Sequence, residues 1–184
     1  KELEVQNVPN PMSGERMKGF YYILSWAVSG DRIFTGFQDR DYEIRLYNPD
    51  GRLTRLIRKD YKHVPVPEEH KQAFMSQFEN PMFDSIRDKI YFPAAMPPFI
   101  GFVADEEGCL YVLTYETGER PGENMVDVFN RDGVFVGRRS LRLYYDEFGP
   151  KARVKNGRLY SVEEKESGYK RLVISRIRLS IPHF

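Results

Sequence analysis

A ten-residue pattern occurs twice in this chain and limits the folds that the chain can adopt. Residues 42–51 read Tyr-Glu-Ile-Arg-Leu-Tyr-Asn-Pro-Asp-Gly, and residues 124–133, 82 positions later, read Asn-Met-Val-Asp-Val-Phe-Asn-Arg-Asp-Gly. Each copy alternates apolar and polar residues, as a half-buried strand does, and ends on Asn-x-Asp-Gly, which favours a tight hairpin turn. We therefore expect Gly51 and Gly133 at positive φ, in a chain built from copies of a hairpin unit.

A second motif opens another strand in each of three units. It reads Gly-Asp-Arg-Ile-Phe at 30–34, Gly-Cys-Leu-Tyr at 108–111 and Gly-Arg-Leu-Tyr at 157–160. The alternation and turn signals around these copies place units at about 20–58, 98–141 and 151–179. We predict an all-β fold of about three four-stranded antiparallel sheets in a single domain, an organisation typical of a propeller or solenoid.

The stretch between the first two units, about residues 60–98, lacks this pattern. Pro67 followed by two glutamates favours a short amphipathic helix over about 68–78, and later prolines break regular structure. We predict a helical insertion. The alternative is a degenerate fourth unit, because Tyr91 ends a similar motif. We favour the insertion, since Tyr91 lies only 20 residues before Tyr111 and a propeller blade takes ~40–50 residues.

The composition is that of a folded, aromatic-rich protein. Of its 184 residues, 41% are hydrophobic and 30% charged, and 14% are aromatic, which suits pleated sheets. The 28 basic and 27 acidic residues nearly cancel, so neither nucleic acid nor an anionic membrane is favoured as a partner. No apolar stretch approaches the ~18–20 residues that a transmembrane helix needs.

Arginines gather in three short stretches, which raises RNA binding through a basic face as an alternative. We interpret them instead as solvated charges on outer strands that discourage sheet aggregation. The three groups are Arg52, Arg55 and Arg58; Arg138, Arg139 and Arg142; and Arg171, Arg176 and Arg178.

Residues that could bind a metal or act as nucleophiles are scattered. Cys109 is the only cysteine, which excludes an intrachain disulfide, and its position in a strand favours a buried thiol over a nucleophile. The acidic turns at 39–41 and 105–107 could offer oxygen ligands to calcium or magnesium, but turns favour acidic residues for local reasons. We expect no cofactor. The histidines lack zinc-site spacing and are expected on the surface: His63, His70 and His183.

Three stretches resemble the blades of six-bladed β-propellers of the broad NHL type. They are 99–112 (Phe-Ile-Gly-Phe-Val-Ala-Asp-Glu-Glu-Gly-Cys-Leu-Tyr-Val), 126–133 and 155–160. The likeness covers about residues 20–179 and is closer to uncharacterised exported bacterial propellers. It implies an exported protein, whether periplasmic, lipid-anchored or extracellular, and it carries no shared activity. Three blades cannot close a six-bladed ring, so the chain resembles about the C-terminal half of such a protein.

An open ring leaves three arrangements. The chain begins at Lys1 without Met, which suggests a processed product or a piece of something longer. We rank first an excised half whose partner half is absent, second a homodimer that completes the ring, and last a four-bladed monomer that uses residues 59–97 as a blade. Alternating apolar residues over 3–8 suggest an N-terminal strand that joins a neighbouring blade.

These features favour a non-enzymatic binding or scaffolding module that recognises a protein or a small molecule. A metal-assisted hydrolase or lactonase is the alternative, if carboxylates converge on a central channel. In an up-and-down blade the loops between second and third strands emerge on the same face as the insertion, so we predict that the helix caps this face and that it binds the ligand. The candidate binding residues are Asp39, Arg40, Asp41, Glu116, Glu119, Arg120, Glu164 and Lys165.

Overall fold

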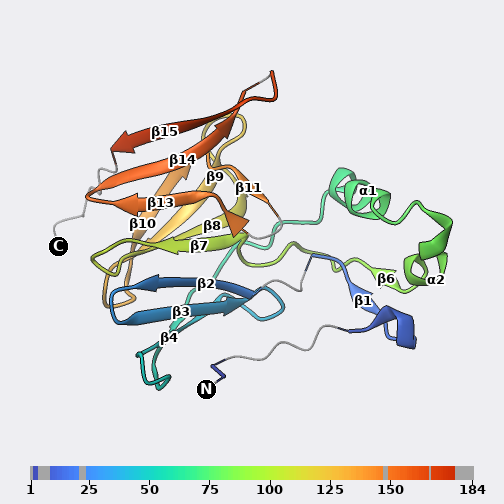
Figure 1. The fold of residues 1–184 in the computed structure, drawn as a ribbon, viewed down its shortest axis with the longest axis horizontal. Coiled ribbons are helices and arrows are strands. Elements are labelled where there is room, and N and C mark those ends of the chain that lie inside the picture. The colour runs from blue at the N-terminus through green and yellow to red at the C-terminus, as the bar shows by residue number, and fades with distance from the viewer. Residues whose placement is uncertain (1, 4–8, 21–23, 147–148, 166, 177–184) are drawn as a thin grey trace.

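The structure is a computed structural model that describes residues 2–3, 9–20, 24–146, 149–165 and 167–176. The strand expected over 3–8 lies almost wholly outside these ranges, as do the expected last residues of the third unit. The chain is mostly β-structure in antiparallel sheets, with two short α-helices (Figure 1). No helix in the described ranges is long and apolar enough to cross a membrane.

Three antiparallel sheets follow one another along the chain, each with its strands in sequence order. The first contains β2 (Leu24–Ser29), β3 (Arg32–Phe37), β4 (Glu43–Tyr47) and β5 (Leu53–Arg58). The second contains β7 (Gly101–Ala104), β8 (Leu110–Thr117), β9 (Asn124–Phe129) and β10 (Phe135–Leu141). The third contains β13 (Ala152–Lys155), β14 (Arg158–Glu164) and β15 (Lys170–Arg176). The prediction of antiparallel four-stranded units is confirmed for two sheets. The third has three strands in the described residues, and no strand there pairs with the outer side of β15.

The sheets pack face to face through two hydrophobic cores. The core between the first and second sheets includes Phe34, Ile44 and Phe129, each at most 1% exposed. The core between the second and third sheets includes Leu113 and Leu159. The first strands of the three sheets lie side by side, with β7 between β2 and β13 (Figure 1). The second sheet therefore packs against a sheet on both faces, whereas each outer sheet packs against another sheet on one face among the residues described.

The two copies of Asn-x-Asp-Gly form the same turn. Gly51 and Gly133 have φ of 74° and 69°, which confirms the expected left-handed conformation. In each turn the glycine N–H donates to the carbonyl oxygen of the asparagine, over 2.9 Å at Asn48 and 2.8 Å at Asn130. The asparagine Oδ1 accepts a further backbone N–H beyond the glycine. The local pattern thus fixes the hairpins independently of the rest of the chain.

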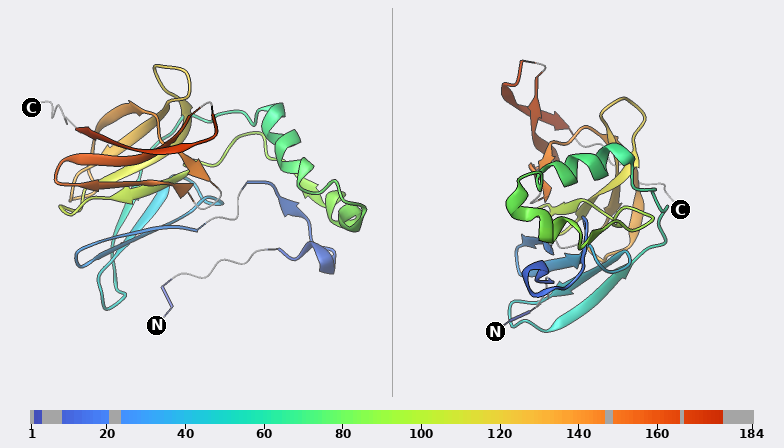
Figure 2. Two further views of the ribbon diagram at one scale, coloured as in Figure 1. Left: turned by 45° about the horizontal axis from the view of Figure 1, so that its top comes forward. Right: turned by 90° about the vertical axis from the view of Figure 1, so that its right-hand side faces the viewer.

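The middle of residues 60–98, from Glu68 to Tyr91, forms a small lobe beside the sheets (Figure 2), and the flanking stretches connect the lobe to them. The lobe contains α1 (Glu68–Ser76), a 3-10 turn η2 (Pro81–Phe83), α2 (Asp84–Arg87) and β6 (Ile90–Tyr91). The N-terminal segment joins it through a 3-10 turn η1 (Pro11–Ser13) and β1 (Met17–Lys18), which pairs in parallel with β6. A two-stranded ribbon, β11 (Tyr145–Asp146) with β12 (Gly149–Pro150), links the second and third sheets.

Aromatic rings hold the lobe together. Phe74 of α1 contacts Phe20, with ring centroids 5.0 Å apart, and also Phe78 and Phe92 at 5.6 and 5.8 Å. Gly19 allows Phe92 to approach, because a Cβ at this glycine would lie 2.6 Å from the Phe92 ring. These contacts give the lobe an apolar centre of its own, separate from the two sheet cores.

Candidate functional site

The loops after β3, β8 and β14 lie at one end of the sheets, and α1 lies at that end as well (Figures 1 and 2). His70 and Phe74 of α1 line one pocket together with Gln38, which follows β3, and Tyr115 of β8. The helix is therefore not beside the Asn48–Gly51 turn at the opposite end. This end of the molecule contains the loops that the sequence analysis grouped as a binding face.

Three of the predicted binding residues line an open hollow at the edge of the first sheet. Asp39, Arg40 and Asp41 form part of its wall, and the hollow has a volume of about 1070 Å³. Glu43 on the same wall accepts hydrogen bonds from Arg45 and Arg58, both over 2.9 Å. Burial opposes ionisation of Glu43, but the two arginines outweigh it and lower the pKa of this carboxyl. The wall thus mixes both signs of charge.

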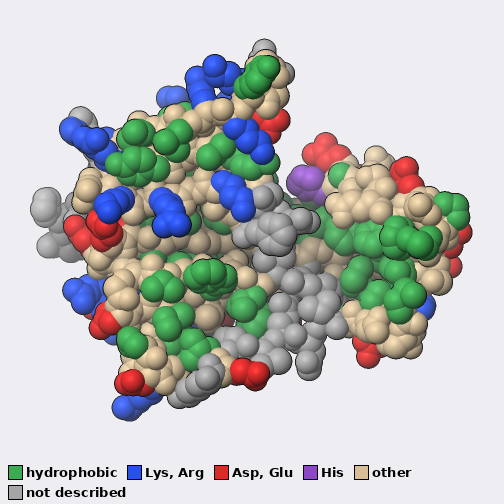
Figure 3. Space-filling model, viewed as in Figure 1, with side chains coloured by type: hydrophobic (Ala, Val, Ile, Leu, Met, Phe, Trp, Pro, Cys, Tyr) green, Lys and Arg blue, Asp and Glu red, His purple; other side chains and the backbone are tan. Residues whose placement is uncertain are grey.

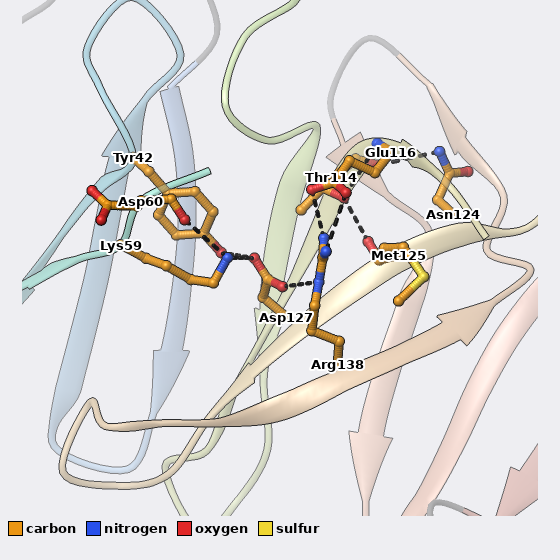
Figure 4. A network of polar contacts seen from close by, with 9 residues as sticks. All are labelled: Tyr42, Lys59, Asp60, Thr114, Glu116, Asn124, Met125, Asp127 and Arg138. Atoms are coloured by element: carbon orange, nitrogen blue, oxygen red, sulfur yellow. Dashed lines mark hydrogen bonds and ion pairs between the residues drawn. The ribbon is translucent and has the colours of Figure 1, made fainter. Parts of the chain in front are cut away.

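Asp127 is 0% exposed and contacts Tyr42 and Lys59, which line this hollow (Figure 4). It lies on β9, on the strand face that packs against the first sheet. The Tyr42 hydroxyl donates to Asp127 Oδ2 over 3.0 Å, and Lys59 Nζ lies 3.2 Å from the same oxygen. Arg138, its partner across the β9–β10 ladder, donates from Nε to Asp127 Oδ1 over 2.7 Å.

Arg138 extends this network to Glu116 at the end of β8. Its two terminal nitrogens donate to the two Glu116 carboxylate oxygens over 3.1 and 2.7 Å (Figure 4). Hydrogen bonding to Glu116 raises the pKa of Arg138, and burial together with the Asp127 charge raises that of Tyr42 well above its ordinary value. Glu116, one of the predicted binding residues, is therefore held in a paired geometry.

This network of polar contacts links the first sheet to the second. Tyr42 directly precedes β4 and Lys59 directly follows β5 of the first sheet, whereas Glu116, Asp127 and Arg138 belong to the second. Both oxygens of the buried carboxylate have donors beside them, so its charge is compensated. We conclude that the network fixes the first sheet against the second.

The remaining predicted binding residues are exposed on two hairpin loops. Glu119 and Arg120 lie in the β8–β9 loop, where the Glu119 N–H donates to Ser140 Oγ over 2.7 Å. Glu164 and Lys165 lie at the β14–β15 turn, where the Lys165 N–H donates to the Tyr169 carbonyl over 2.9 Å. The eight residues are thus spread over three loops of one end, in three different environments.

Sequence reasoning missed four members of the network, namely Tyr42, Lys59, Asp127 and Arg138. Arg138 was assigned to a group of solvated edge charges, and this is wrong, because its side chain is ion-paired with two carboxylates. A signal was present at Asp127, a charged residue flanked by Val126 and Val128 in an otherwise apolar strand. Such a position indicates either a bulge or a buried, paired charge.

The described residues contain no group of three or more His, Cys, Asp or Glu side chains placed to hold a metal ion. His63 is exposed, and its ring lies 4.6 Å from that of Tyr61. His70 is exposed on α1, and His183 lies outside the described ranges.

Cys109 lies between the Asp105 turn and β8 and is partly buried. Burial, followed by the nearby charges of Asp105 and Glu107, raises the pKa of the thiol to about 11. A thiol with such a pKa is almost entirely protonated near neutral pH, and the thiolate is the nucleophilic form.

We therefore expect slow modification of Cys109 in the folded chain. At pH 8, its reaction with a disulfide reagent such as DTNB should be on the order of 100-fold slower than in the chain unfolded in guanidinium, because the thiolate fraction falls about tenfold for each pKa unit. The measurement is the absorbance of the released thiolate over time. Equal rates in the two states would show that the thiol is accessible and ionised.

No family model matches this sequence, and no curated protein is similar enough to count as a relative.

Proposed function

We propose that this chain is a non-enzymatic binding or scaffolding module of the propeller type, whose two outer sheet faces receive further sheets of the same repeat. The observation that carries the proposal is the regular way in which its own sheets pack. Each internal contact joins one kind of face to the other, and at each end one face has no further sheet packed on it in the part of the chain that the structure describes.

The first kind of face contains the residue that precedes the last, aromatic residue of the motif repeated at 30–34, 108–111 and 157–160. Leu110 and Leu159 occupy this position in the second and third sheets, and both are buried against the preceding sheet, at 0% and 4% exposure. Ile33 is the equivalent in the first sheet, where no preceding sheet is present in the described residues. Its neighbours on that face include Trp26 and Val28, which are 67% and 54% exposed.

The second kind of face contains the aromatic residue that ends the same motif. Phe34 and Tyr111 are buried against the following sheet, at 1% and 6% exposure. Tyr160 is the equivalent in the third sheet, and it pairs across the ladder with Ile174, which is 55% exposed. Leu172, on the same face, is 66% exposed. Hydrophobic side chains gather over β2–β3 and over β14–β15 (Figure 3).

A sheet of the same repeat offers the opposite kind of face to each of these surfaces. Burying apolar area is favourable by about 25 cal/mol per Å², and contiguous apolar patches on soluble proteins commonly mark interaction sites. The proposal therefore explains why alternating apolar residues continue on both outer faces.

The charges on the two faces favour a different polypeptide over a second copy of this chain. The uncovered face of the third sheet carries Arg153, Arg158 and Arg176, all exposed, and the last two lie directly opposite each other in the ladder. The uncovered face of the first sheet carries Arg45 and Arg58 around one glutamate. Pairing two copies would place arginines against arginines, so the expected partner sheet carries carboxylates.

The test uses the chain by itself. Trp26 is its single tryptophan, and it lies on an outer face, so energy transfer from Trp26 to the dye ANS detects an apolar surface there. We expect ANS binding with energy transfer, which falls in a Val28→Lys, Leu56→Lys variant. The matched control is Met82→Lys, because Met82 is 73% exposed but lies on the lobe; it should leave the transfer unchanged.

Light scattering completes the test. A stable monomer of 21.7 kDa that binds no dye would contradict the docking faces. A discrete particle of twice that mass with blue-shifted Trp26 emission would contradict the charge argument and identify the partner as a second copy.

A further inference from the structure

A small pocket lies between α1 and the adjacent ends of the first two sheets. Its volume is about 330 Å³, which lies at the lower end of the range for small-molecule sites. Phe74 of α1 lines one side, and Met96, Ile100 and Tyr115 line the side of the sheets. The wall is therefore largely apolar and rich in aromatic rings, and it is separate from the outer sheet faces discussed above.

Gln38 adds one buried polar group to this wall. Its side chain is 0% exposed, and Nε2 donates to the carbonyl oxygen of Ile100 over 2.9 Å. That bond fixes the orientation of the amide, because only the nitrogen can donate to a carbonyl. The other amide atom, Oε1, is buried and has no hydrogen-bond partner among the residues that the structure describes. Buried polar atoms are nearly always paired, so this unpaired acceptor beside a pocket points to a missing donor. A donor from the pocket reaches Oε1 when a side chain of the wall shifts, because the atom has almost no open surface.

We propose that this pocket binds a small, uncharged aromatic molecule that donates an N–H to Gln38 Oε1. The aromatic class follows from the walls, because rings pack favourably against Phe74 and Tyr115 at their faces and edges. The lack of charge follows from the lining, since the described residues around the pocket include no Asp, Glu, Lys or Arg, and a buried charge without a partner is costly. The ionisable side chain of His70 in this lining is exposed on α1.

Indole and 1-methylindole test this proposal, because they share a ring system and differ in the N–H. We expect indole to bind with a Kd below about 1 mM and about 10-fold more tightly than 1-methylindole, since the methylated ring leaves Oε1 unpaired. Isothermal titration gives the affinities. Saturation-transfer NMR gives the contact with the protein directly, and neither method depends on an activity.

Two variants locate the site. Gln38→Met keeps a side chain of similar size without the acceptor, so this variant should bind indole and 1-methylindole with about equal affinity. Ala73→Trp fills the pocket from α1, where Ala73 is exposed and its replacement leaves the sheet cores untouched; it should abolish binding of both compounds. Circular dichroism and the melting temperature confirm that each variant is folded.

The outcomes that would overturn the proposal are distinct. Equal affinity for the two compounds in the natural chain would show that Oε1 is satisfied by water or accepts no ligand donor. Failure of both to bind at millimolar concentration would show that the pocket takes no aromatic molecule. Unchanged binding by the Ala73→Trp variant would place the site elsewhere.

Discussion

Replacing Asp127 with alanine will lower the free energy of unfolding by about 3–5 kcal/mol. The carboxylate is 0% exposed and compensates two cations, with Lys59 Nζ at 3.2 Å and Arg138 Nε at 2.7 Å. Its removal takes this partner from Lys59 Nζ, which lies beside the rings of Tyr42 and Phe135, and takes from Tyr42 the acceptor of its hydroxyl, whereas Arg138 keeps its pair with Glu116. The loss therefore comes mainly from uncompensated groups that remain, and less from the bonds themselves.

The matched control is an ion pair on the surface. Glu106 and Lys155 are 3.1 Å apart with side chains 55% and 61% exposed, so Glu106→Ala should cost at most about 1 kcal/mol. Asp127→Asn keeps the shape and one acceptor and should fall between the two. Guanidinium or urea unfolding curves give the three values. If Asp127→Ala cost no more than Glu106→Ala, the network would not hold the first two sheets together.

The sheets were predictable because their signals are local. The motif at 30–34 was predicted to open a strand, and it opens β3 (Arg32–Phe37). The Asn-x-Asp-Gly turns close with the hydrogen bonds that their residue types favour. Alternation and turn chemistry act over fewer than ten residues, so a single sequence contains them in full.

The buried polar groups were not predictable in the same way, because their partners come from another sheet. Arg45 occupies in the first copy of the repeat the position that Asp127 occupies in the second, yet only Asp127 lies in a covered core. Gln38 directly follows β3, next to the acidic turn at 39–41, yet it is buried and its side chain donates to the carbonyl oxygen of Ile100 before β7. Whether such a residue is exposed depends on which sheet covers it.

The lobe shows the same limit for backbone pairing. The helix expected over about 68–78 forms as α1 (Glu68–Ser76). The residues that favour its start and those that form its apolar side lie close together in the sequence. The parallel pairing of β1 with β6 joins Met17 to Ile90, and nothing in either short segment indicates the other. Asp88–Tyr91 resembles the motif repeated at 30–34, 108–111 and 157–160. Its last two residues nevertheless form β6, which pairs with β1 outside the three large sheets.

Replacing Gly133 with alanine will destabilise the chain more than the same change at Gly157, although both glycines have a similar backbone. Their φ values are 69° and 65°, so a Cβ should cost about 1–2 kcal/mol at either site. At Gly157 a Cβ would meet no atom within 4 Å, whereas at Gly133 it would lie 2.9 Å from Ile57 Cγ1 and 3.1 Å from Arg55 Cδ.

Ile57 cannot easily move away, because it is 3% exposed in the core between the first two sheets. Overpacking of this kind costs typically 1–3 kcal/mol, so we expect a total of about 2–5 kcal/mol at Gly133 against about 1–2 at Gly157. The larger Gly133→Val should cost more again. The double variant Gly133→Ala, Ile57→Val isolates the contact, since removing a methyl group from Ile57 should recover part of the loss only if the two residues touch. Equal losses at the two glycines in urea unfolding would show that the Gly133 turn does not pack against the first sheet.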